Sequence, residues 1–121
     1  MNLFFYVMNI PMVDKMKRKT INIPIYNSSL TIIFDKDFSY IEKKYGTESL
    51  SNYGAITMRN PFKFGHYIVA FTHTKEGIIA HEIVHLVNYI FKDKGIKLDV
   101  ENDEAQAYLT GWLYDKIENF I

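Results

Sequence analysis

The chain contains no cysteine among its 121 residues. Disulfides, thiolate metal sites and cysteine nucleophiles are therefore excluded, and any zinc has to be bound by imidazole and carboxylate groups. The chain also lacks an excess of charge, because 14 Lys and Arg residues balance 14 Asp and Glu residues. Without a basic field, we expect no nucleic-acid partner and no attraction to an anionic membrane surface.

A hydrophobic run of membrane-spanning length is also missing. The apolar residues 3–8 are followed by Asn9 and Pro11, well before the ~20 residues that a spanning helix needs. The basic residues 15–19 come after this run, whereas a secretory signal carries its positive charge in front. We therefore expect no membrane partner and a cytoplasmic location, or a virion if the protein is encoded by a phage.

The length and composition fit one continuous domain over residues 1–121, since 48% of the residues are hydrophobic and 23% are charged. Alternating and β-branched residues predict strands at 20–25, 30–34, 53–58 and 66–72. Apolar residues at helical spacing predict three helices: 37–45, one between Thr74 and Gly95, and one after residue 102. Strands and a helix followed by two helices predict an α+β fold.

The second predicted helix contains the sequence His81-Glu82-Ile83-Val84-His85, which has the pattern H-E-x-x-H. Two histidines four residues apart project from one face of a helix, so both imidazoles can bind one metal ion. Glu82 stands beside that face, where its carboxylate can contact an activated water without binding the metal, and its expected role is general base.

Catalytic zinc usually takes three protein ligands, so a carboxylate is expected downstream of the two histidines. Glu101 and Glu104 share one face of the last predicted helix, distinct from the apolar face that carries Leu109 and Leu113. A glutamate on that face could reach back to the metal.

These features resemble the gluzincin metallopeptidases, in which H-E-x-x-H lies on one helix and a glutamate on a following helix completes the site. The resemblance covers about the last third of the chain. Glu104 is followed by the small Ala107, and its spacing from His85 is similar to that of thermolysin-like members. The resemblance implies that His81, His85 and Glu104 bind one Zn²⁺ per chain and that Glu82 is the base and proton shuttle. Glu101, one turn earlier, is the alternative third ligand.

The same resemblance implies a minimal zincin-like domain, in which a twisted, mostly antiparallel sheet packs on the motif helix and the C-terminal helix. An edge strand of that sheet would bind extended peptide by backbone hydrogen bonds. The segment just before the motif helix would be this strand: Tyr67, Ile68, Val69, Ala70 and Phe71. Tyr108 stands where thermolysin-like members have an orienting aspartate, and the chain is too short for their second subdomain, so a protein partner could complete the cleft.

His73, Tyr108 and Tyr53 are candidates for stabilising the oxyanion of a tetrahedral transition state, although surface or packing roles would also explain them. The sequence thus predicts a zinc-dependent peptidase that hydrolyses peptide or protein substrates with water activated by the metal. One alternative is a non-catalytic structural or interaction domain of zincin fold, for example in a phage virion or a regulatory complex. Another is a metal-dependent hydrolase with a substrate other than peptide.

Overall fold

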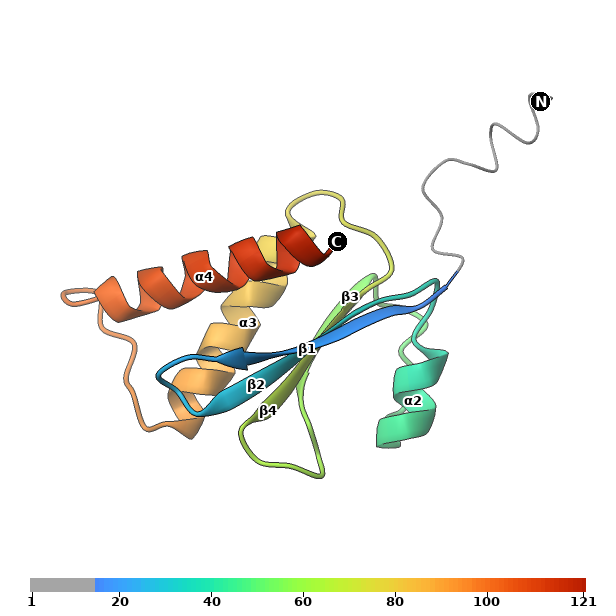
Figure 1. Ribbon diagram of the computed structural model, residues 1–121, viewed down its shortest axis with the longest axis horizontal. Coiled ribbons are helices and arrows are strands. Elements are labelled where there is room, and N and C mark those ends of the chain that lie inside the picture. Colours follow the sequence, from blue (N-terminus) through green and yellow to red (C-terminus); the bar gives the residue numbers. More distant parts are fainter. Residues whose placement is uncertain (1–14) are drawn as a thin grey trace.

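The computed structural model describes residues 15–121, so the interpretation of residues 3–8 lies outside the described part. Two pairs of strands, with a short helix between them, are followed by two long helices (Figure 1). This arrangement confirms the α+β fold. The elements are β1 (Lys17–Ile23), β2 (Ser28–Phe34), α2 (Ser39–Tyr45), β3 (Ala55–Arg59), β4 (His66–Phe71), α3 (Ile78–Asp93) and α4 (Glu104–Phe120).

The four strands form one sheet in the order β1-β2-β4-β3. The pairs β1–β2 and β3–β4 are antiparallel and β2–β4 is parallel, so the sheet is mixed but mostly antiparallel. The two antiparallel pairs are each formed by strands that follow one another along the chain. The parallel pairing of β2 with β4 joins them, and it requires a connection that passes through α2 and β3.

The prediction that residues 67–71 form the edge strand is wrong. They belong to β4, which pairs with β2 on one side and with β3 on the other. Both faces of β4 are covered, and Tyr67, Ile68, Val69, Ala70 and Phe71 are all buried. A continuous apolar run of this kind is typical of an interior strand. Within residues 15–121, the strands at the two edges are β1 and β3.

Helices cover both faces of the sheet. Alternate residues of β4 point to opposite sides, so Tyr67 and Val69 join the core with α3 and α4, whereas Ile68 and Ala70 join a smaller core with α2. In Figure 1, α4 crosses α3, and the two helices pack through Leu86, Leu113 and other buried side chains. Each large side chain that is fully buried contributes about 1.5–3 kcal/mol relative to an exposed one.

The start of α3 differs from the prediction. The sequence places the start of this helix after Thr74, whereas Gly77 is the N-cap residue and the helix begins at Ile78. Glu76 and Gly77 both have left-handed backbone angles, with φ of 58° and 72°, which turn the chain sharply from β4 into the helix. Among residues 15–121, no helix has the length and apolar character that crossing a membrane requires.

Candidate metal and catalytic site

His81 and His85 lie one turn apart on the exposed face of α3, and their Nε2 atoms are 3.2 Å apart. Two nitrogen ligands of a tetrahedral zinc ion, each about 2.0–2.1 Å from the metal, are separated by about 3.3 Å. The two imidazoles are therefore already at the separation that joint binding of one ion requires. The opposite face of α3 holds them in place, because Ile83, Leu86 and Val87 are buried in the main core.

Glu82 is buried, with 5% of its surface exposed, although it lies between two exposed histidines. The hydroxyl of Thr57, on β3, donates a hydrogen bond of 2.8 Å to Oε1 of Glu82. The other carboxylate oxygen, Oε2, lies 3.7 Å from Nε2 of His81. One oxygen is thus fixed by the sheet and the other faces the imidazole pair, where it can accept a proton from a reacting group.

In the part of the chain that the structure describes, one group of His, Asp and Glu side chains is close enough to hold a metal ion. It consists of His81, Glu82 and His85, whose ligand atoms all lie within 4.8 Å of one another. The spacing that the sequence suggested is therefore compatible in space with a site of H-E-x-x-H type. Imidazole nitrogens and carboxylate oxygens are ligands that zinc accepts.

The structure does not bring the downstream glutamates to this group. Glu104 is the first residue of α4, Glu101 lies in the preceding turn, and both are exposed. Neither belongs to the group formed by His81, Glu82 and His85. Figure 1 shows α4 starting on the side of the molecule where α3 ends, whereas the two histidines lie in the first half of α3.

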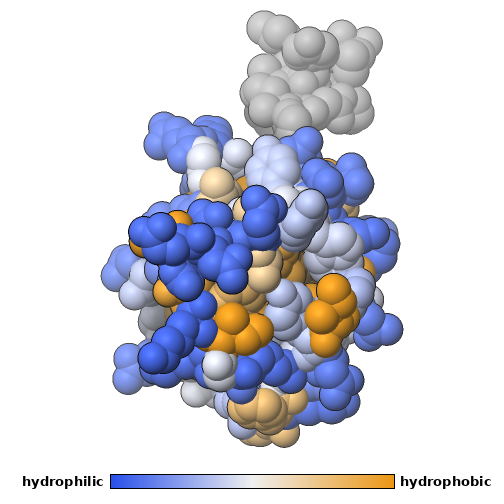
Figure 2. Space-filling model, turned by 90° about the vertical axis from the view of Figure 1, so that its left-hand side faces the viewer, coloured by the Kyte–Doolittle hydropathy of each residue, from blue (hydrophilic) through white to orange (hydrophobic). Residues whose placement is uncertain are grey.

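Tyr108 is placed elsewhere, which corrects its interpretation as a transition-state stabiliser. It is 76% exposed and lines an apolar cavity of about 640 Å³ between the β1–β2 turn and α4. Ile25 and Trp112 also line this cavity, but none of the three motif residues does. Figure 2 looks onto this side of the molecule and shows apolar residues separated by hydrophilic ones.

The site opens into a hollow of about 400 Å³ that runs along β3. Its walls are α3, β3 and the segment that leads into β3. A second hollow of about 350 Å³ adjoins it, and the two share Tyr53, Ala55, His81 and Glu82. His73 lines the second hollow, so the structure brings His73 and Tyr53 close to the motif. The first hollow is lined by Thr47, Leu50, Tyr53, Ala55, Ile56, Thr57, Met58, His81, Glu82, His85 and Tyr89.

The backbone of β3 has free groups on the side of the sheet where β4 does not lie. The N–H of Thr72 donates to the carbonyl of Gly54 at 2.9 Å, so these two residues form a hydrogen-bonded pair of the β3–β4 ladder. Bonding alternates along an antiparallel strand, so Ile56 also bonds to β4 while Ala55 and Thr57 face outward. Sequence reasoning did not identify β3 as part of the site, because strand order is not encoded in local patterns.

A polar cluster fixes the far end of β3 against α3. Nε and Nη2 of Arg59 contact Asp93 at 3.0–3.1 Å, and the hydroxyl of Tyr67 donates to Asp93 at 2.7 Å. Burial by itself raises the pKa of Asp93, but the hydrogen bonds from Arg59 and Tyr67 outweigh it and hold this pKa below its usual value. Burial, followed by the bond to Asp93, raises the pKa of Tyr67 far above its usual value, so its hydroxyl remains a donor.

Comparison with protein-family models, with curated proteins and with solved structures found no match to this chain. The description of the protein therefore rests on its fold and on the geometry of the candidate site. This is an α+β domain with a histidine pair at zinc-chelating distance, a buried glutamate beside it and an open edge strand along the adjoining hollow.

Proposed function

We propose that this chain is a zinc-dependent peptidase of zincin type, in which His81 and His85 hold the ion and Glu82 is the general base. The observation that carries the proposal is the 3.2 Å separation of the two Nε2 atoms, with the carboxylate of Glu82 beside them. When bound, zinc would supply a Lewis acid that polarises the scissile carbonyl and makes water acidic enough to react near neutral pH.

The arrangement of Glu82 supports its role as the base. Thr57 occupies Oε1, so Oε2 is left to take a proton from the attacking water and to deliver it to the leaving amine. Because Glu82 is 5% exposed and tied to β3, its carboxylate has a fixed direction before substrate binds. Fixing the group in advance lowers the entropy that the reaction step has to lose.

A peptide substrate is supported by the position of β3. The outward N–H and C=O groups of Ala55 and Thr57 are free to pair with an extended chain, and Thr57 also contacts Glu82. A peptide paired there would lie along the hollow lined by Leu50, Met58 and Tyr89, with one of its bonds close to Glu82. The edge strand that the resemblance required is therefore proposed to be β3 in place of β4.

The proposal includes His81 and His85 as metal ligands but not Glu104. Glu104 was predicted from the resemblance, and the structure leaves it outside the group formed by the motif residues. From this geometry we expect Glu104→Ala to keep the zinc affinity of the wild type. A loss of more than about 100-fold in that affinity, beyond the roughly 10- to 100-fold effect of losing an indirect partner of a metal ligand, would show that α4 supplies the third ligand.

The test combines metal analysis with one substitution. Protein purified without chelator should contain close to one zinc per chain. Glu82→Gln should retain the zinc and lose cleavage of a peptide library by about 10²–10⁴-fold, because removal of a general base has effects of this size. The matched control is Glu118→Gln, which makes the same change at an exposed position of α4 and should leave cleavage unchanged.

Each result has a defined meaning. Protein without zinc would contradict the proposal at its first step. Protein that binds zinc but cleaves no peptide in the library would favour a structural or interaction domain instead. If Glu82→Gln cleaved as fast as the wild type, Glu82 would not be the base.

A further inference from the structure

His73 lies outside α3 but shares a hollow with the motif residues. It is the second residue after β4, is half-buried, and lines the second hollow together with His81 and Glu82. The preceding residue, Thr72, bonds to Gly54, so the hydrogen bonds between the two strands extend to the residue just before His73. The imidazole is thereby held next to the beginning of β3.

A backbone contact defines which nitrogen of the ring carries the proton. The N–H of Lys75 donates to Nδ1 of His73 at 3.2 Å. A backbone N–H can only donate, so Nδ1 accepts and the proton of the neutral ring is on Nε2. The Nε2–H group of His73 is therefore a hydrogen-bond donor.

The position of this donor depends on Gly54. A Cβ atom at residue 54 would lie 2.4 Å from Nε2 of His73, closer than such atoms approach each other. Gly54 is not among the glycines with positive φ, so the backbone does not require a glycine here. What requires it is the space that the imidazole of His73 occupies.

The free edge of β3 ends at Ala55, one residue away from Gly54, against which the imidazole of His73 lies. Ala55 faces outward, but the next outward residue, Tyr53, already uses its N–H in a bond of 3.1 Å to the carbonyl of Leu50. A chain paired with β3 would therefore find no backbone donor on β3 beyond Ala55. The Nε2–H group of His73 adjoins this gap, because Nε2 lies against Gly54, the residue between Tyr53 and Ala55.

We propose that His73 is a substrate-binding residue, which donates a hydrogen bond from Nε2 to a main-chain carbonyl of a peptide that pairs with β3, just beyond Ala55. This inference rests on the proposed function. A hydrogen bond to the main chain does not depend on the side chain at that position. It therefore lengthens the stretch of peptide that the site binds without restricting the amino-acid sequence of the peptide. A bond made equally in the ground and transition states changes KM and leaves kcat unaltered, unlike stabilisation of an oxyanion.

The experiment measures peptide binding in the Glu82→Gln background, where cleavage does not interfere. The probe is a random mixture of octapeptides, acetylated at the N-terminus and carrying a C-terminal fluorophore, and fluorescence anisotropy gives the apparent Kd. His73→Ala should weaken binding by about 3- to 10-fold, the effect of one hydrogen bond. His73→Gln, which keeps a side-chain N–H donor, should recover part of this loss.

Gly54→Ala tests the same contact without changing the histidine. It should displace the imidazole and weaken binding as much as His73→Ala does. Because the two changes act through one contact, the double variant should bind no more weakly than either single variant. Gly111→Ala is the matched control, since a Cβ there meets nothing within 4 Å.

The outcomes separate the two proposals. If the Glu82→Gln parent binds no peptide, both the proposed function and the role of His73 are overturned. If the parent binds peptide and His73→Ala binds equally well, only the role of His73 is overturned. A fall in kcat with unchanged KM for His73→Ala in otherwise wild-type enzyme would also overturn it, in favour of a transition-state role.

Discussion

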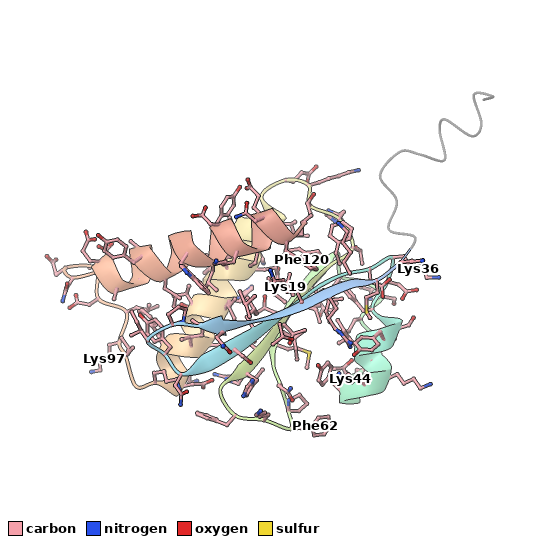
Figure 3. All side chains as sticks on the ribbon, viewed as in Figure 1. Lys19, Lys36, Lys44, Phe62, Lys97 and Phe120 are labelled. Carbon is pink, nitrogen blue, oxygen red and sulfur yellow. The ribbon has the colours of Figure 1, made fainter. Side chains whose placement is uncertain are left out.

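The strands β1 and β3 close opposite edges of the sheet, and their residues differ in charge. β1 begins with Lys17, Arg18 and Lys19, which are all exposed; Lys19 is labelled in Figure 3. β3 has a single charged residue, Arg59, at its end, and this residue is paired with Asp93. Positive side chains on an edge strand discourage pairing with another chain.

The uncharged edge is the one beside the motif. β2 and β4 separate β1 from β3, and the hollow that contains His81 and Glu82 runs along β3. Under the proposed function, a sheet that protects one edge and leaves the other open next to a candidate catalytic residue would accept an extended chain at the open edge alone. The proposed function therefore predicts different effects of substitutions in β3 and in β1.

The largest effect is expected from placing a positive charge on the open edge. Thr57→Lys removes the hydroxyl that fixes Glu82 and puts an ammonium group beside the carboxylate and in the path of the peptide. We expect kcat/KM for library peptides to fall by at least about 10²-fold, the lower limit for loss of a general base. Steady-state cleavage assays measure this change.

The control keeps the shape of the residue and removes only its hydroxyl. Thr57→Val should reduce kcat/KM by no more than about tenfold, because a single hydrogen bond is lost. Wild-type cleavage by Thr57→Lys would show that peptide does not bind along β3. Equal losses in the two variants would assign the effect to the contact with Glu82 and not to the edge.

A smaller effect is expected from removing the charges that protect β1. The double variant Lys17→Thr and Lys19→Thr should increase self-association relative to the wild type, because Arg18 is then the one charged residue that protects the edge formed by β1. Cleavage should be unchanged, since neither residue lines the hollows at the site. Analytical ultracentrifugation over a range of concentrations measures the association.

The matched control for β1 is Lys92→Thr with Lys97→Thr, which removes the same charge from exposed positions outside the sheet; Lys97 is labelled in Figure 3. Equal association of both double variants would mean that net charge, and not the edge of β1, governs the effect. Association of the β1 variant alone would support protection of that edge.

The sequence was sufficient to predict features that depend on neighbouring residues. Alternation around Ile21 and Ile23 predicted the first strand, and four-residue spacing placed His81 and His85 on one face of a helix. Gly95 was expected to end that helix, and it lies just past the helix with a φ of 72°. Such features follow from local backbone geometry, so local patterns reveal them.

Features that depend on distant pairing could not be predicted. An apolar run such as that of β4 is compatible with an edge next to the motif helix or with the middle of the sheet, and only the pairing of β2 with β4 decides between them. The path of the chain between α3 and α4 likewise decides where Glu104 and Tyr108 lie. Thr57 gave no signal at all, because its contact with Glu82 joins residues far apart in the sequence.

The smallest effect is expected from weakening the contacts that hold the end of β3 against α3. Asp93→Asn weakens the bonds from Arg59 and Tyr67 that fix the end of β3 against α3. Because Arg59 is 42% exposed and solvent screens the pair, we expect a loss of only about 1 kcal/mol in the free energy of unfolding at pH 7. Urea denaturation measures this loss, and Asp115→Asn, at an exposed position of α4, is the control.

The pH dependence of this loss has a definite sign. The pKa of Asp93 lies below its usual value of 3.8 in the folded protein, since Arg59 and Tyr67 outweigh the effect of burial. A carboxyl group of this kind stabilises the fold above its unfolded pKa, and the contribution disappears as the pH falls through the folded pKa. The difference between wild type and Asp93→Asn should therefore be full at pH 7 and shrink below about pH 4. If the difference stayed constant down to the lowest pH at which the protein folds, packing and not the charge of Asp93 would hold the end of β3, and the edge would owe its position to Tyr67 and the core beneath it.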